Sequence, residues 1–171
     1  GINQSPNFSN NSTYNTEESF NFEIGHSLSK NKTSLKSSIF YMYRKSPQLR
    51  LFIQNNIYYP TYFDYATFNG SKSYTYGLES NVNHKISKKL ILKSSITLLE
   101  NHLGIFYFDE NGDNVNEKFG NRTGAHSPKL SFILGVELKF NSNLSLNINS
   151  NYKDKFYFDD QNNHISKDYI L

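Results

Sequence analysis

The feature that most constrains this chain is a two-residue alternation between apolar and polar side chains. In the segment 130–140 the even positions carry Leu, Phe, Leu, Val, Leu and Phe, whereas the odd positions include Ser, Gly, Glu and Lys. Successive side chains of a β-strand point to opposite faces, so this pattern predicts a strand with one apolar and one polar face. Six further segments alternate in the same way: 20–28, 35–43, 74–86, 90–98, 144–158 and 166–171.

The connections between these segments alternate in length. Three are short and polar, at 29–32, 87–89 and 141–143, and three are long, at 46–73, 101–127 and 159–165. Alternating short turns and long loops between antiparallel strands are typical of up-and-down barrels that span a membrane. Strands of this length also suit a tilted crossing, which needs about 9–11 residues.

Composition excludes several other classes of protein. The chain has 171 residues, of which 36% are hydrophobic and 16% aromatic, and it contains no Cys. Without a run of about 18 apolar residues it has no candidate transmembrane helix, and its aromatic content argues against disorder. The missing Cys excludes disulfide scaffolds and thiol catalysis. The net charge of +3 is spread along the chain and indicates no nucleic-acid partner.

Aromatic side chains gather at the ends of the predicted strands that adjoin the long loops. Tyr41, Tyr43, Tyr74 and Tyr76 lie there, whereas positions near the short turns are mostly aliphatic, with Phe140 as the exception. Amphipathic rings collect at the headgroup level of a membrane, so this sorting predicts an aromatic belt at the outer interface. A soluble β-sandwich explains the polar faces equally well but does not explain the sorted rings.

The number of predicted strands leaves two forms of barrel open. Seven is odd, whereas single-chain bacterial barrels close with an even number of strands. Either the chain is a section of a larger barrel, or an eighth strand lies within 54–69 and closes a small barrel. The alternatives for function are therefore a complete eight-stranded outer-membrane barrel with a structural or adhesive role, and a soluble carbohydrate-binding β-sandwich.

Five short motifs follow one another across nearly all 171 residues, at 17–25, 39–48, 76–79, 125–128 and 157–171. In the second, the run 39–44 is followed by Ser-Pro-Gln; the third contains Gly-Leu-Glu, and the fourth ends in Pro. In this order and spacing they resemble a descending strand, an ascending strand with its outer rim, a Gly-Leu-Glu strand, a strand entrance and the approach to a late strand. The family that these motifs resemble is the β-barrel of TonB-dependent outer-membrane receptors.

The resemblance implies an all-β fold, an antiparallel up-and-down transmembrane β-barrel of which residues 1–171 form a seven- or eight-strand section. Such barrels have 22 strands around a plug, so the plug, the TonB-contacting segment and the final two strands are expected to lie outside this sequence. The implied function is TonB-energised import of a scarce nutrient, by default an iron–siderophore complex, across the outer membrane of a Gram-negative bacterium. The implied partners are outer-membrane lipid, the TonB complex through the plug, and the nutrient. An enzyme is not expected, nor is any cofactor.

Candidate nutrient-binding residues lie in the predicted outer rim and loops. Arg44, Gln48 and Arg50 cluster at the outer end of one strand, where basic groups raise the local concentration of anionic nutrients. Tyr62 belongs to an aromatic stretch that suits stacking on a ligand, and His126 lies beside another outer loop. The plainer interpretations are surface solubility, packing of the loop on itself and a solvated imidazole. No catalytic residue or metal ligand is predicted.

Three glutamates fall on the polar face of strands that run in the same direction. Glu23, Glu79 and Glu137 each lie two residues from a Gly. In a barrel this parity directs the carboxylates into the lumen, so we expect them to face a plug. The alternative is that they only contribute to a lumen that is polar in any case.

Overall fold

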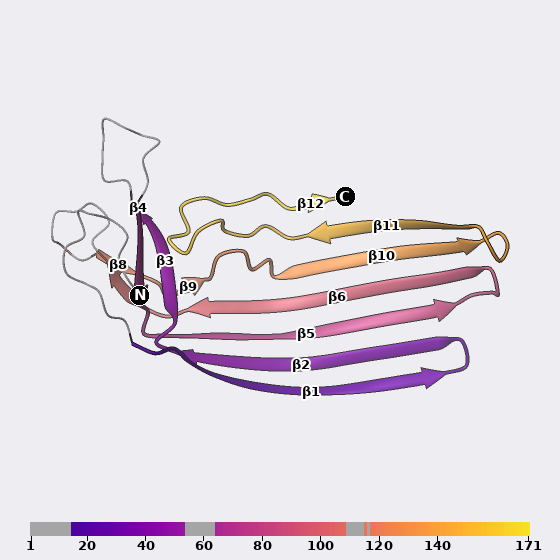
Figure 1. Cartoon of the computed structure of the whole chain (residues 1–171), viewed down its shortest axis with the longest axis horizontal. Coiled ribbons are helices and arrows are strands. Elements are labelled where there is room, and N and C mark those ends of the chain that lie inside the picture. The colour runs from indigo at the N-terminus through magenta and orange to yellow at the C-terminus, as the bar shows by residue number, and fades with distance from the viewer. Residues whose placement is uncertain (1–14, 54–63, 109–114, 116) are drawn as a thin grey trace.

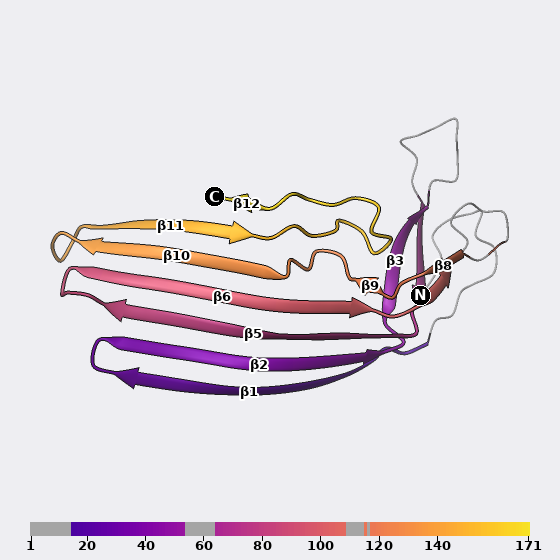
Figure 2. The ribbon, with the colours of Figure 1, turned by 180° about the vertical axis from the view of Figure 1, so that it is seen from behind.

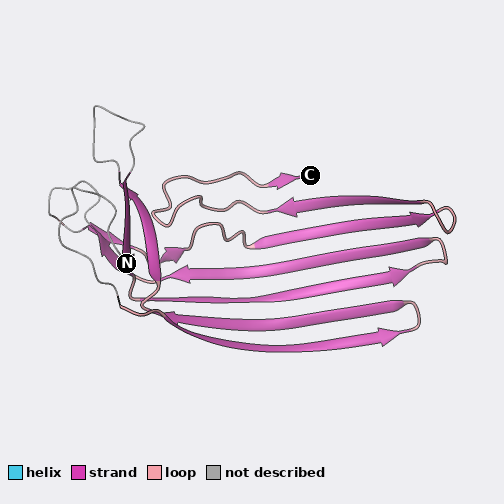
Figure 3. Ribbon diagram, viewed as in Figure 1, coloured by secondary structure: helices cyan, strands magenta, loops and turns pink. Residues whose placement is uncertain are grey.

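The structure is a computed structural model that describes residues 15–53, 64–108, 115 and 117–171. Its regular elements are strands, as Figure 3 shows. None of the described residues forms a helix that is long and apolar enough to cross a membrane. The strands are β1 (Glu18–Lys30), β2 (Thr33–Lys45), β3 (Gln48–Ile53), β4 (Asp64–Asn69), β5 (Lys72–Lys85), β6 (Leu90–Leu103), β7 (Phe106–Phe108), β8 (Glu117–Phe119), β9 (Arg122–Thr123), β10 (Leu130–Lys139), β11 (Ser145–Lys153) and β12 (Tyr169–Ile170).

One antiparallel sheet contains all the long strands, in the order β1-β2-β5-β6-β10-β11-β12, and β9 extends the sheet beside β6. Neighbours in sequence are mostly neighbours in space, as in an up-and-down meander. The three short turns lie at one end of the sheet, and the hairpins β3–β4 and β7–β8 project from the other end (Figures 1 and 2). The predicted all-β fold and its alternation of short turns and long connections are therefore confirmed.

The register of the strands is staggered across the sheet. Lys30 lies opposite Thr33, Thr33 opposite His84, His84 opposite Leu92 and Leu92 opposite Val136. Beyond this row, toward the short turns, β1 has no further residue, whereas β5 continues for one more residue and β10 for three. The turns accordingly step outward from β1 to β11, as Figure 1 shows. Strands that tilt relative to a barrel axis require such a stagger.

The two faces of the sheet differ in the way that the alternation predicts. A typical apolar row crosses five strands through Ile24, Ile39, Leu78, Leu98 and Leu130. Many side chains of this face are exposed, including that of Ile39 at 53%. Exposed apolar surface on this scale marks a contact with lipid or with another protein rather than a face in water.

Buried apolar side chains in the described part of the chain lie at the loop end of the sheet rather than under it. Leu49, Leu103 and Phe106 form this small core, and Phe68 and Phe119 pack against it. The ring of Phe106 contacts both of those rings, with centroid distances of 5.2 Å to Phe68 and 5.6 Å to Phe119. The core therefore fixes the hairpins β3–β4 and β7–β8 against the end of β6 and leaves both sheet faces open.

The aromatic side chains occupy two adjacent rows near the loop end of the apolar face. Phe20, Tyr43 and Tyr74 lie in the outer row, beside His102. The rings of Tyr74 and His102 stack at 4.7 Å. The inner row contains Phe22, Tyr41 and Tyr76. This is the position that the sequence predicts for an interfacial belt.

Two strand predictions need correction. A strand does lie within 54–69, but it is β4, which pairs with β3 in a separate hairpin and adds nothing to the main sheet. The positive φ of Ser46 (51°) and the buried Pro47, which lacks an amide hydrogen, end β2 and divert the chain out of the sheet. The segment predicted as 144–158 ends as a strand at Lys153. In the next residue, the Asp154 carboxylate accepts a hydrogen bond from the amide of Lys155 at 2.8 Å.

Candidate functional site

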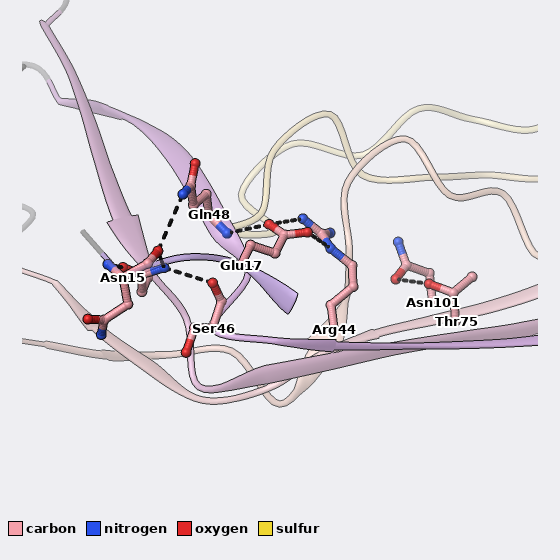
Figure 4. A network of polar contacts seen from close by, with 8 residues as sticks. Asn15, Glu17, Arg44, Ser46, Gln48, Thr75 and Asn101 are labelled. Atoms are coloured by element: carbon pink, nitrogen blue, oxygen red, sulfur yellow. Dashed lines mark hydrogen bonds and ion pairs between the residues drawn. The ribbon is translucent and has the colours of Figure 1, made fainter. Parts of the chain in front are cut away.

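A polar cluster lies where β1 and β2 reach the loop end of the sheet (Figure 4). The Glu17 carboxylate accepts two hydrogen bonds from the Arg44 guanidinium, from Nε at 2.6 Å and from Nη2 at 2.8 Å. The backbone amide of Gln48 donates a third bond to the same carboxylate at 2.8 Å. Both charged side chains are less than one-third exposed. The hydrogen bond from Arg44 holds the pKa of Glu17 below its usual value of 4.5.

The same cluster ties the chain before β1 to the base of the β3–β4 hairpin. The Asn69 amide nitrogen donates to the backbone carbonyls of Asn15 (3.1 Å) and Ser46 (2.7 Å). Its oxygen accepts from the backbone amide of Asn15 at 2.7 Å, and the Gln48 side chain donates to the Asn15 carbonyl at 3.4 Å. Arg44 and Gln48 thus share one network in which Glu17 balances the charge of Arg44.

A second network holds the loop before β10 against the sheet. The Asn101 oxygen accepts from the Thr75 hydroxyl at 3.0 Å, as Figure 4 shows, and the Asn101 nitrogen donates to the Ser127 hydroxyl at 2.7 Å. The Ser127 hydroxyl donates to the Ala125 carbonyl, and the Ala125 amide donates to the Asp160 carboxylate at 2.7 Å. Two connections distant in sequence therefore pack together over the loop end.

The side chain of His126, another predicted rim residue, is not part of these two hydrogen-bond networks. His126 is exposed and lies beside Phe156 and Phe158, with ring centroids 5.9 and 6.2 Å away. Its backbone has a positive φ of 53°. Arg50 belongs to β3, but its side chain is not described, and Tyr62 lies outside the described residues. The structure therefore brings Arg44 and Gln48 together and places His126 in a separate aromatic cluster.

The three glutamates of the polar face lie at different depths along their strands. Glu23 lies seven residues before the end of β1 and Glu79 six before the end of β5, and both line one concavity of about 440 Å³ with Lys36. Glu137 lies two residues before the end of β10. Its carboxylate forms ion pairs instead, with Lys93 Nζ at 2.7 Å and with Lys139 Nζ at 3.4 Å.

Sequence reasoning missed Glu17, Asn101 and Ser127, although one signal for Glu17 was available. If the two strands that flank the short turn at 31–32 are paired residue by residue, residue 17 lies opposite residue 46. Glu17 is then close to Arg44, which lies two residues before that position. No comparable local signal exists for Asn101 and Ser127, because their contact crosses from β6 to a long connection. Within the described part of the chain, no three His, Asp or Glu side chains are grouped so that they could hold a metal ion.

The chain is similar to known bacterial receptors. The family model described as "TonB dependent receptor-like, beta-barrel" matches residues 2–171. No curated protein sequence matches the chain. The fold is similar to that of the ferric yersiniabactin uptake receptor FyuA from Yersinia pestis, with a TM-score of 0.65 and 17% identity over 90% of this chain. It is also similar to the siderophore receptor PiuA from Acinetobacter baumannii, with a TM-score of 0.66 and 22% identity over 95% of this chain.

A third structure, the ferric-catecholate import receptor Fiu from K12 E. coli, has a TM-score of 0.59 and 14% identity over 99% of this chain. The chain spans only 21–22% of the length of these three proteins. At these identities the structures show a shared fold alone, and the family model over residues 2–171 shows the family. The chain belongs to the TonB-dependent receptor-like β-barrel family.

Proposed function

We propose that this chain forms part of the wall of an outer-membrane receptor that imports a scarce nutrient with energy delivered through TonB. The nutrient is by default an iron–siderophore complex. In this proposal residues 1–171 are one section of a single barrel domain, which is completed by a plug and further strands outside this sequence.

The observation that carries the proposal is the family match over residues 2–171, together with a sheet whose apolar face is exposed. Such a face suits contact with lipid, and the staggered register suits the wall of a barrel. The proteins with a similar fold are described as receptors for ferric yersiniabactin, siderophores and ferric catecholate. Iron chelates are therefore the first nutrients to test.

The rim residues would contact the nutrient before it enters the barrel. Gln48, Arg50, Tyr62 and His126 are the candidates for this contact. Arg44 has a different role in this proposal, because the Glu17 carboxylate already neutralises its guanidinium. It would orient the β3–β4 hairpin, through Glu17 and the Gln48 amide, rather than attract an anion by charge.

Iron uptake tests the proposal directly. A strain that lacks the gene should lose uptake of a radiolabelled ferric siderophore under iron limitation, and the wild-type gene should restore it. Uptake should stop when TonB is removed or the proton gradient is dissipated. Uptake that persists without TonB would contradict energised transport, and unchanged growth on every iron chelate tested would contradict the nutrient class.

The glutamates of the polar face can be tested in the same strain. Replacing Glu23, Glu79 and Glu137 by Gln should leave insertion into the membrane intact and impair plug retention or uptake. Insertion is checked by heat-modifiable migration on a gel. Normal uptake by an inserted triple variant would refute a role for these carboxylates in facing a plug.

A further inference from the structure

Lysine side chains surround a concavity on the polar face, close to the short turns. Its volume is about 360 Å³, and Lys32, Lys85, Lys93 and Lys139 contribute to its lining. Glu137 is the only acidic residue among the side chains that line it. The alternation of the strands does not reveal this cluster, because each lysine comes from a different turn or strand.

The positive charge of this concavity is only partly balanced. Glu137 forms ion pairs with Lys93 and Lys139, and Lys32 Nζ donates to the backbone carbonyl of Ile86 at 3.2 Å. Within the described part of the chain, Lys85 forms no ion pair. Four ammonium groups against one carboxylate leave three surplus positive charges. Like charges on neighbouring strands repel, so an anionic partner would relieve an unfavourable arrangement.

The spread of the lysines indicates the size of that partner. Lys32 lies in the turn before β2, and the other three lysines lie on β5, β6 and β10. Adjacent strands are about 4.8 Å apart, so the cluster extends over roughly 15 Å. One phosphate or carboxylate cannot contact groups so far apart. An extended peptide rises about 3.3 Å per residue, so a segment of about five residues with several acidic side chains matches this span.

The face on which the lysines lie argues against a lipid headgroup. Lys93 shares its face with Asn83 and Gly135, whereas the adjacent Leu92 belongs to the apolar face with Val136. Lipid covers the apolar face of a barrel wall, and the polar face lines the interior. A partner that reaches all four lysines therefore lies inside the barrel, near its turn end.

We propose that this lysine cluster is the docking site of an extended acidic peptide segment that crosses β2, β5, β6 and β10 inside the barrel. The proposal rests on the barrel wall described above and not on the identity of the nutrient. Its test measures contacts rather than uptake. The docking proposal can therefore fail while the proposal of energised transport stands, and energised transport can fail while docking stands.

Zero-length cross-linking provides the test. Isolated outer membranes from cells that produce the protein from its own gene are treated with a carbodiimide, which joins carboxylates to amines in direct contact. Mass spectrometry then identifies the linked peptides. We expect Lys85 to be joined to Asp or Glu residues of one acidic segment, and Lys93 or Lys139 to be joined to the same segment. Links with Glu137 can occur in addition. If the concavity holds only a free anion, a lipid phosphate or solvent, the lysines will be linked to Glu137 alone. That result would overturn the proposal.

A charge reversal supplies the matched comparison. In a Lys85→Glu variant the link that Lys93 or Lys139 forms with the acidic segment in the wild type should be lost, although both lysines remain. Lys72→Glu, at the opposite end of the same strand, should leave them unchanged. Heat-modifiable migration shows that each variant is folded. When the wild-type protein is treated with carbodiimide in high salt, the same links should be lost without any substitution. Links that survive both high salt and the Lys85→Glu substitution would refute docking by charge.

Discussion

The rim pair of Glu17 and Arg44 gives a prediction that can be followed from single atoms to a measured rate. Replacing Glu17 by Ala removes the acceptor of three hydrogen bonds, two from the Arg44 guanidinium and one from the Gln48 amide. The partly exposed ion pair contributes up to about 1 kcal/mol. The bond from the Gln48 amide contributes about 1 kcal/mol more. The change should therefore destabilise the base of the β3–β4 hairpin by about 1–2 kcal/mol.

Hydrogen exchange measures this loss at the atom concerned. Because the Gln48 amide donates to the Glu17 carboxylate, its exchange in Glu17→Ala should be about five to thirty times faster than in the wild type. Glu18→Ala is the matched control, since Glu18 pairs with Lys45 at 3.4 Å between side chains that are more than half exposed. The control should change exchange at Gln48 by no more than about twofold. Equal effects of the two substitutions would refute the assigned role of Glu17.

The same pair sets a pH dependence of known sign. Arg44 lowers the pKa of Glu17 below 4.5, so the pair contributes its full stabilisation above that pH. The stabilisation is lost as the pH falls through the lowered pKa, because the protonated carboxyl no longer pairs with the guanidinium. The difference in Gln48 exchange between wild type and Glu17→Ala, compared at equal pH, should therefore persist at neutral pH and vanish in strong acid. A difference that grew on acidification would contradict this linkage.

Three further substitutions test the sheet. Gly77→Ala brings a Cβ within 2.7 Å of the Phe40 ring and against the Leu98 carbonyl, so it should cost about 1–3 kcal/mol in thermal unfolding, and Phe40→Ala should reduce that cost in the double variant. Asn101→Ala removes the acceptor of the Thr75 hydroxyl and the donor to the Ser127 hydroxyl, and should cost about 1–3 kcal/mol in the same assay. Leu98→Lys on the apolar face should oppose membrane insertion by about 2–4 kcal/mol, whereas Thr97→Lys on the polar face should insert normally on heat-modifiable gels.

The strands could be predicted from the sequence because the signal for a strand is local. Each run of alternating residues specifies its own two faces, whichever strand lies beside it. The predicted segments 20–28, 35–43 and 90–98 accordingly all lie inside strands of the structure, as β1, β2 and β6. The aromatic belt follows for the same reason, since the rings occupy equivalent positions on neighbouring hairpins.

The predictions that failed depend on contacts beyond the strand itself. The stretch 54–69 has the residues of a strand, but whether it joins the main sheet depends on the turn at Ser46 and Pro47 and on the small core around Leu103. The strand β11 likewise ends at Lys153, before the last residues of the segment predicted as 144–158. Alternation continues past that point in the sequence, so a periodic pattern alone places the boundary too late.

The sequence by itself determined that this chain forms long antiparallel strands with one apolar and one polar face. Only the tertiary structure decided which polar groups meet. It neutralises Arg44 with Glu17, separates His126 from the other rim candidates and gathers lysines from several strands around Glu137. The physical reason is that alternation depends on one strand, whereas a contact between hairpins depends on their register, which is set by turns, stagger and packing far away in the chain.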